Sequence, residues 1–103
     1  MPLDEINRCI AEYEQYNFIF TDDFLLKIRA KCNSWKNDWV ESFKKILRKI
    51  RKGEEGSPAY DKENGRRLTV PLVKNRYMAV FFNPQTNGSY FVYGFELEIK
   101  DTI

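Results

Sequence analysis

The segment from residue 66 to residue 99 constrains the fold more than any other part of the chain. At its start, Leu68, Val70 and Leu72 alternate with polar residues or proline, which is the period-two pattern of a strand with one buried face. Two further β-rich runs follow, and turn-forming residues separate all three. The segment therefore predicts three consecutive antiparallel strands. Their expected spans are about 66–73, 76–83 and 89–99.

Two short turns set the expected pairing of these strands. The first is Lys74-Asn75, a two-residue connection in which Asn tolerates the positive φ of a tight hairpin. It places Val73 opposite Arg76. The second turn spans 83–88 and ends in Asn-Gly. It places Arg76 opposite Glu96.

This register gives the two faces of the sheet different characters, because paired residues share a face. The face expected to be covered by helices collects Leu68, Val70, Leu72, Tyr77, Ala79, Phe81, Phe91, Tyr93, Phe95 and Leu97. The opposite face collects Arg67, Thr69, Val73, Arg76, Met78, Val80, Phe82, Tyr90, Val92, Gly94, Glu96 and Glu98. Pro71 removes a ladder donor, so the first strand is expected at the sheet edge.

The residues before the sheet predict helices over about 3–16, 22–33 and 35–52. Thr21 is the expected N-cap of the second helix. The pattern leaves open whether 22–52 forms one helix or two, with Ser34 as a candidate cap. Residues 17–20 are expected to be a short connection. The predicted fold class is α+β, a single domain over 1–103. Two or three N-terminal helices pack on one face of a C-terminal antiparallel meander of three to four strands.

Composition narrows the functional classes. The chain is 43% hydrophobic and 31% charged, as in an ordinary globular domain. It has no apolar run near the ~18 residues of a membrane span and an acidic start unlike a signal peptide, so we expect a cytoplasmic protein without a membrane partner. Cys9 and Cys32 lack metal-ligand spacing and are expected to be buried free thiols. There is no histidine and no GxxxxGK loop, so neither a metal nor another cofactor is expected.

Positive charge is concentrated at the end of the third helix, with no acid interleaved. The basic residues are Lys44, Lys45, Arg48, Lys49, Arg51 and Lys52. One interpretation is a solvated helix face whose cations favour the helix C-terminus. The other is a surface for RNA or another polyanion. Under the second interpretation, Arg66 and Lys74 join this cluster as candidate nucleic-acid-binding residues.

The face expected to be open brings together residues suited to metal-independent RNA cleavage. Such cleavage needs a base for the 2′-hydroxyl and cations for the pentacovalent phosphate. Glu96 is the candidate base, Arg76 and Arg67 are the candidate phosphate clamps, and Tyr90 is expected to stack or donate a proton. The alternative is that Arg76 and Glu96 form only a cross-strand ion pair.

The segment GRRLTVPLVKNRYMAVFFNPQTNGSYFVYGFE, preceded by helices and a basic stretch, resembles in pattern the RelE-like and barnase/EndoU/colicin-type small ribonucleases of bacterial toxins. RelE-like toxins use Arg, Lys, Tyr and Glu without a required histidine or metal. By strand position the resemblance implies Arg66, Arg67, Lys74, Arg76 and Tyr93 as site residues. Tyr93 falls on the expected helix-covered face, and the acid and histidine of the barnase group have no counterpart pair here.

Two functions follow as hypotheses. The first is a small cytoplasmic ribonuclease of bacterial toxin type, which binds RNA through the basic helix and the sheet face and is held by an antitoxin. The second is a non-catalytic interaction or inhibitor protein of a phage or mobile element. It would dock on a target protein within a nucleic-acid-handling complex.

Overall fold

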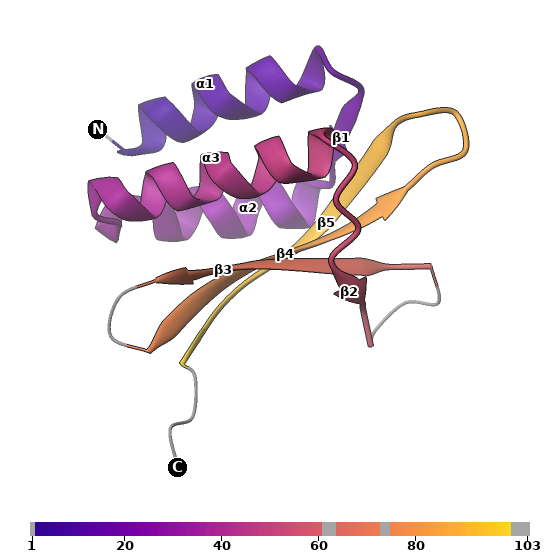
Figure 1. Ribbon diagram of the computed structural model, residues 1–103. Helices are drawn as coiled ribbons and strands as arrows, with labels where there is room; N and C mark the ends of the chain where they lie inside the picture. Colours follow the sequence, from indigo (N-terminus) through magenta and orange to yellow (C-terminus); the bar gives the residue numbers. More distant parts are fainter. Residues whose placement is uncertain (1, 61–63, 73–74, 100–103) are drawn as a thin grey trace.

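The computed structural model describes residues 2–60, 64–72 and 75–99, without the side chains of residues 37, 98 and 99. The fold is α+β, as predicted: three helices pack on one face of a sheet (Figure 1). Within the described residues, the sheet has five strands in the order β1-β5-β4-β3-β2. It is mixed rather than purely antiparallel, because β1 runs parallel to β5.

The helices are α1 (Pro2–Glu14), α2 (Asp22–Lys31) and α3 (Asn37–Arg51), with a short 3-10 turn, η1 (Cys32–Ser34), before α3. Thr21 caps α2 as predicted, since its hydroxyl oxygen accepts a hydrogen bond of 3.1 Å from the Phe24 amide. The chain breaks at η1, which answers the question left open by the sequence. The proposed cap at Ser34 is wrong, because its hydroxyl donates backward to the Lys31 carbonyl and Lys36 occupies the N-cap position.

Two of the five strands were not predicted. Strand β1 (Phe18–Phe20) was expected to be a connection, but it pairs with β5 (Tyr90–Ile99) at one edge of the sheet. Strand β2 (Ser57–Pro58) forms the other edge by pairing with the first two residues of β3 (Arg66–Leu72). The first predicted strand, β3, was expected at the sheet edge. This is wrong for Arg66 and Arg67, because β2 pairs with them. Pro71 lies beyond the β2 pairing, where its missing amide costs no ladder bond.

The predicted register is wrong for both hairpins. Asn75 has the expected positive φ of 62°, but three residues rather than two separate Leu72 from Arg76, its partner in β4 (Arg76–Pro84). Arg76 therefore does not pair with Val73. The second hairpin contains a β-bulge: Phe81 pairs with Gly94, whereas its neighbour Phe82 pairs with Val92. One slipped residue turns every side chain of β4 to the opposite face.

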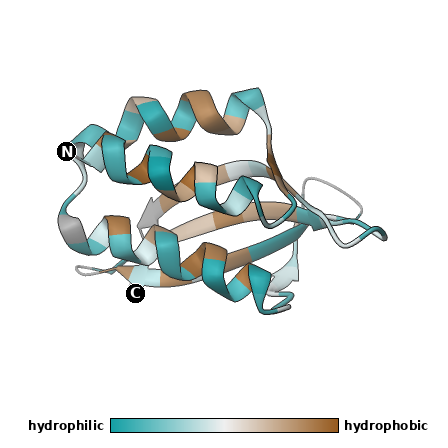
Figure 2. Cartoon of the chain, turned by 90° about the horizontal axis from the view of Figure 1, so that it is seen from above, coloured by the Kyte–Doolittle hydropathy of each residue, from teal (hydrophilic) through white to brown (hydrophobic). Residues whose placement is uncertain are grey.

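The main core lies between the helices and the sheet. From β4 and β5 it takes five side chains, and four of these were predicted on the face opposite the helices; only Phe95 was predicted on the helix-covered face. The five are Met78, Val80, Phe82, Val92 and Phe95. Seen from above, the helices lie side by side over strands in which brown, hydrophobic segments occur among paler and teal ones (Figure 2). From the helices, Phe24 and Phe43 stack on each other with ring centroids 6.3 Å apart, and Trp35 lies 5.4 Å from Phe95.

The face assignments can now be corrected strand by strand. They are right for the β3 residues Leu68 and Val70 and for Phe95 and Leu97 in β5. They are wrong throughout β4 and for the part of β5 before the bulge. The residues predicted under the helices that lie on the other face are Tyr77, Ala79, Phe81, Phe91 and Tyr93; those that lie on the helix side against prediction are Arg76, Met78, Val80, Phe82, Tyr90 and Val92.

Candidate functional site

The candidate site is the face of the sheet that points away from the three described helices (Figure 1). We call it the open face. Its sheet residues are Arg67, Thr69, Pro71, Tyr77, Ala79, Phe81, Phe91, Tyr93, Gly94 and Glu96. The segment after β2 adds Ala59 and Tyr60, which pack against Phe81. The open face is therefore built by three antiparallel strands and one connecting loop.

An aromatic patch of Tyr60, Tyr77, Phe81 and Tyr93 occupies the middle of this face. The Tyr60 and Phe81 rings meet edge to face at 5.9 Å, and the Phe81 and Tyr93 centroids are 6.1 Å apart. Phe81 is only 3% exposed, whereas Tyr60 is 77% exposed. The patch thus has a buried base and an accessible aromatic surface.

The Arg67 guanidinium lies over this patch. Its central carbon is 5.2 Å from the Tyr77 ring centroid and 5.9 Å from that of Phe81. Guanidinium groups favour such positions because the ring face is electron-rich. Arg67 and Arg76 also line one hollow of about 260 Å³ with Thr69, Pro71 and Tyr77. The Arg67 cation therefore borders the aromatic surface, and Arg76 lines the hollow beside it.

Two glycines make the patch possible. Gly94 faces Phe81 across the bulge, where an added Cβ would lie 3.0 Å from the Phe81 Cβ. Gly56 has φ +63° and brings the loop so close to β3 that a Cβ would collide with the Arg67 carbonyl oxygen. The loop backbone is also held by the Arg66 side chain, which donates to the carbonyls of Glu55 and Gly56. These contacts position the segment that carries Tyr60.

Glu96 is the carboxylate of the open face. Its Oε1 atom accepts a hydrogen bond of 3.1 Å from the Tyr60 hydroxyl. Its Oε2 atom is shielded from solvent and receives no hydrogen bond from the described residues. A carboxylate oxygen without a hydrogen-bond partner has a lone pair free to take a proton from a substrate hydroxyl.

The structure brings together only some of the residues that were predicted to be catalytic. Arg67 and Glu96 lie on the open face, as predicted. The predicted pairing of Arg76 with Glu96 is wrong: Arg76 lies opposite Ile99, and Glu96 lies opposite Ala79. The Arg76 guanidinium lies 5.9 Å from the ring of Trp39 on the helix side, while still lining the hollow at the sheet end.

Tyr90 lies on the helix side as well. Its ring is 5.0 Å from that of Phe18 and packs against the main core. The bulge between β4 and β5 causes this change, because it reverses the side-chain parity of β5 between Val92 and Phe95. Tyr90 is therefore not placed to act with Arg67 and Glu96.

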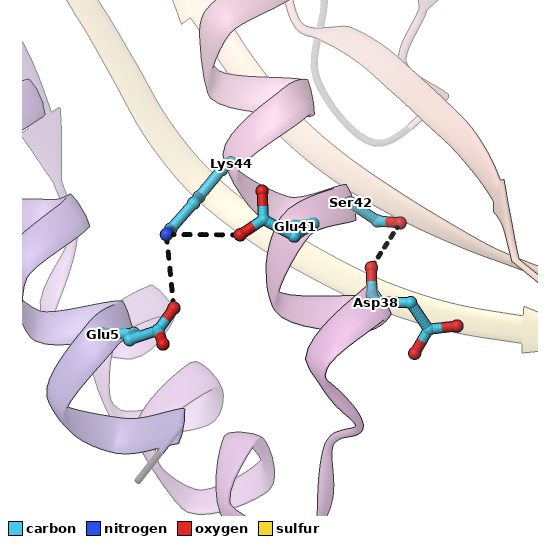
Figure 3. A network of polar contacts seen from close by, with 5 residues as sticks. All are labelled: Glu5, Asp38, Glu41, Ser42 and Lys44. Carbon is cyan, nitrogen blue, oxygen red and sulfur yellow. Dashed lines mark hydrogen bonds and ion pairs between the residues drawn. The ribbon is translucent and has the colours of Figure 1, made fainter.

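The basic helix end divides into two stripes, because residues three and four apart share a face of a helix. Lys44, Arg48 and Arg51 line the groove between α1 and α3. There Lys44 forms ion pairs of 3.2 Å with Glu5 and 3.5 Å with Glu41 (Figure 3). The hydrogen bond to Glu5, with the Glu41 carboxylate adding to it, raises the pKa of the Lys44 ammonium. Within this stripe, Lys44 links α3 to α1.

Arg51 is also engaged within the protein, since its guanidinium stacks 3.4 Å from the Tyr16 ring centroid. The second stripe consists of Lys45, Lys49 and Lys52; the first and last of these are exposed and Lys49 is half-buried. These three lysines remain candidates for phosphate contacts. The Arg66 side chain is engaged by loop carbonyls, and Lys74 lies outside the described residues.

Sequence reasoning missed Tyr60, Tyr77 and Phe81 as members of one surface. A signal was present, because Gly94 interrupts an otherwise aromatic and β-branched strand, and such a glycine often marks a bulge or a close approach. Allowing one extra residue there would have turned Phe82 and Phe95 to the same face.

Within the described ranges, no cluster of three or more Cys, Asp or Glu side chains is arranged to hold a metal ion. None of the helices in that part of the chain is long and apolar enough to cross a membrane. Comparison with family models, with curated proteins and with solved structures gives no match. The resemblance to small ribonuclease toxins therefore stays a prediction.

Proposed function

We propose that this protein binds single-stranded RNA on the open face. The observation that carries the proposal is the aromatic patch with the Arg67 guanidinium over it, on a sheet face that the described helices leave uncovered. Bases stack on Tyr77, Tyr93 and Tyr60, and the Arg67 guanidinium contacts phosphates. The proposed site of action is the cytoplasm, a reducing compartment in which free thiols such as Cys9 and Cys32 persist.

The chemistry of the patch suits an unpaired strand better than a duplex. Sequence-tolerant binding of single strands combines aromatic rings, on which successive bases stack, with cations that follow the backbone. Stacking contributes about 1–3 kcal/mol per base. Tyr60 and Tyr93 both lie against the buried Phe81 ring, with centroids 5.9 Å and 6.1 Å from it, so the patch holds several rings rather than one isolated ring.

The test is to measure binding of fluorescein-labelled single-stranded RNA by anisotropy for Tyr77→Leu and Arg67→Gln. Each change should weaken binding about 5- to 150-fold, because each removes stacking or a cation of the patch. The chain offers a matched control in Tyr16→Leu and Arg51→Gln, an aromatic–arginine pair away from the open face. The control variants should bind within about twofold of the parent.

Equal weakening in both pairs would place the binding surface elsewhere. A parent protein that binds no single-stranded RNA would contradict the proposal outright.

A second candidate function is metal-independent RNA cleavage on the same face. The observation that favours it is the Glu96 carboxylate, 3.1 Å from the Tyr60 hydroxyl and on the same face as Arg67. Glu96 would accept the 2′-hydroxyl proton as that oxygen attacks the phosphorus, and Arg67 would stabilise the phosphate in the transition state. The bond to the 5′-oxygen breaks, water protonates this leaving oxygen, and a 2′,3′-cyclic phosphate remains. An antitoxin covering the open face would then hold the activity in check.

The substitution Glu96→Gln separates the two functions. If the protein cleaves RNA through Glu96, this change should lower the cleavage rate by about two to three orders of magnitude and leave RNA affinity within a few-fold. If the parent protein binds RNA but does not cleave it, the cleavage function is contradicted and only the binding function remains.

A further inference from the structure

A polar hollow lies at the end of the sheet, between the start of β3 and the turn that joins β4 to β5. Its volume is about 670 Å³, and its polar lining residues are Asn64, Arg66, Asn83, Gln85 and Thr86. Asn83 follows Phe81 by two residues in β4, so its side chain leaves the sheet on the open face, about 7 Å along the strand from the aromatic patch. The hollow therefore continues the open face beyond the patch.

The charge of this hollow suits an anion. Arg66 carries the one formal charge among the described lining residues, and no carboxylate in that part of the chain lines the hollow to repel an anion. The Arg66 Nε and Nη2 atoms donate to the carbonyls of Glu55 and Gly56 at 2.9 Å and 3.0 Å, which hold the guanidinium in place. A guanidinium has more N–H donors than these two bonds use. The remaining donors suit a phosphate group.

The side-chain amides present mainly acceptors to a ligand. The Asn83 side-chain nitrogen donates to the carbonyl oxygens of Asn64 and Pro84, both at 3.2 Å. The Gln85 side-chain nitrogen donates to the Asn83 carbonyl, also at 3.2 Å. Because an amide nitrogen carries two hydrogens, Asn83 has only its Oδ1 atom left for a ligand, whereas Gln85 has its Oε1 atom and one N–H. Two oxygens and one N–H match an amino group that lies next to an acceptor.

We propose that this hollow holds one nucleotide of a single-stranded RNA and prefers cytosine or adenine to uracil. The inference rests on the RNA binding proposed above and adds a base preference to it. Cytosine and adenine both carry an exocyclic amino group beside an unprotonated ring nitrogen. The oxygens of Asn83 and Gln85 accept the amino hydrogens, and the free Gln85 N–H donates to the ring nitrogen, as such amides do with adenine.

Uracil fits this set of groups less well. It has a carbonyl oxygen in place of the amino group, so at least one of the two amide oxygens is left without a hydrogen bond. Arg66 contacts the phosphate of the bound nucleotide, which all bases share. The amides therefore set the preference for the base, and Arg66 contributes affinity without it.

The test measures anisotropy of fluorescein-labelled oligo(C) and oligo(U) of about eight nucleotides at neutral pH. These two oligonucleotides are matched, because cytosine and uracil are pyrimidines of similar size. The parent protein should bind oligo(C) about 5- to 10-fold more tightly than oligo(U), the effect of about one hydrogen bond.

Gln85→Ala should reduce this preference to about twofold or less by weakening the binding of oligo(C) while leaving that of oligo(U) unchanged. Gln85→Glu keeps an acceptor oxygen and should keep the preference, although its negative charge lowers the affinity for both oligonucleotides. Gln15→Ala is the matched control, because Gln15 is an exposed glutamine outside the hollow, and it should change neither affinity. Gln85 is exposed as well, so its replacement should leave the protein folded, which circular dichroism checks.

Tyr77→Leu separates this inference from RNA binding itself, because loss of the patch should weaken the binding of both oligonucleotides by the same factor. Equal affinity of the parent protein for oligo(C) and oligo(U) would overturn the base preference and leave RNA binding on the patch in place. So would a preference that Gln85→Ala retains in full. A parent protein that binds neither oligonucleotide would overturn the proposed RNA binding and this inference with it.

Discussion

Phe81 and Phe82 are neighbours in β4 and are almost equally buried, at 3% and 1% exposure, yet they lie on opposite faces of the sheet. Phe82 belongs to the main core, where helices cover it. Phe81 is covered by the loop that carries Ala59 and Tyr60 and by the neighbouring Tyr77 and Tyr93. Two phenylalanines of similar burial are thus covered by different parts of the chain, one by helices and the other by a loop and neighbouring tyrosines.

The difference separates stability from binding. A side chain beneath packed helices is surrounded by elements that are themselves fixed by many contacts. A side chain beneath a loop is covered by a segment with fewer buried neighbours, and such segments open at lower free-energy cost. Burial of Phe82 therefore contributes more to the stability of the fold, whereas Phe81 lies under a loop segment that opens at lower free-energy cost.

The largest expected effect comes from truncating the two phenylalanines separately. Phe82→Ala should lower the free energy of unfolding by ~3–5 kcal/mol, because the helix-covered core cannot collapse into the cavity. Phe81→Ala should cost about half as much, since the loop above it is able to relax, and it should also weaken RNA binding. Urea unfolding of both variants measures the difference. Equal costs would remove the distinction between the two faces.

The next effect concerns how the loop is attached. Gly56→Ala places a Cβ against the Arg67 carbonyl at a φ of +63°, and we expect it to lower the free energy of unfolding by ~2 kcal/mol or more. Gly53→Ala is the matched control. Its φ is +95°, but an added Cβ meets no atom within 4 Å, so it carries only the conformational cost.

Urea unfolding and RNA anisotropy should both distinguish the two glycine variants, with Gly56→Ala the weaker in each measurement. If the two substitutions cost the same, the close approach of the loop to β3 contributes nothing to the attachment of Tyr60.

The helices, the cap at Thr21 and the three long strands could be predicted from sequence because their signals are local: apolar periodicity, a capping hydroxyl and alternation. The strand faces could not be predicted in the same way. They depend on a loop of three residues instead of two before Arg76, and on one extra residue near Gly94. Each is a change of a single residue, but parity carries it along a whole strand.

The parity of the strands also explains which residues of the candidate site were predicted on the correct face. Arg67 was placed correctly because β3 kept its predicted face, and Glu96 because it follows the bulge, where the parity error cancels. Arg76 and Tyr90 were predicted on the wrong face because they lie where the parity error does not cancel. Strand β1 escaped prediction because three apolar residues carry no periodic signal, and its parallel partner lies about seventy residues away in the chain.

The smallest effect tests how tightly the helix side is sealed. Cys9 is 4% exposed between α1 and α3, and burial raises the pKa of its thiol to about 12 from an ordinary value of 9.0. As the pH rises above 9.0, the thiol ionises first in the unfolded chain, while the folded protein keeps its proton until about pH 12. The contribution to stability is therefore complete below pH 9.0 and is lost as the pH rises towards 12.

Between pH 9 and about pH 10 this single group should lower the free energy of unfolding by about 1 kcal/mol. Cys9→Ala lowers stability at every pH by leaving a small cavity, but it should remove that part of the alkaline slope. Urea unfolding at the two pH values gives both slopes, and other groups that titrate in this range cancel in the comparison. Parallel slopes for the parent and the variant would mean that water reaches the thiol, and that the helix side is less closed than the contrast between Phe82 and Phe81 requires.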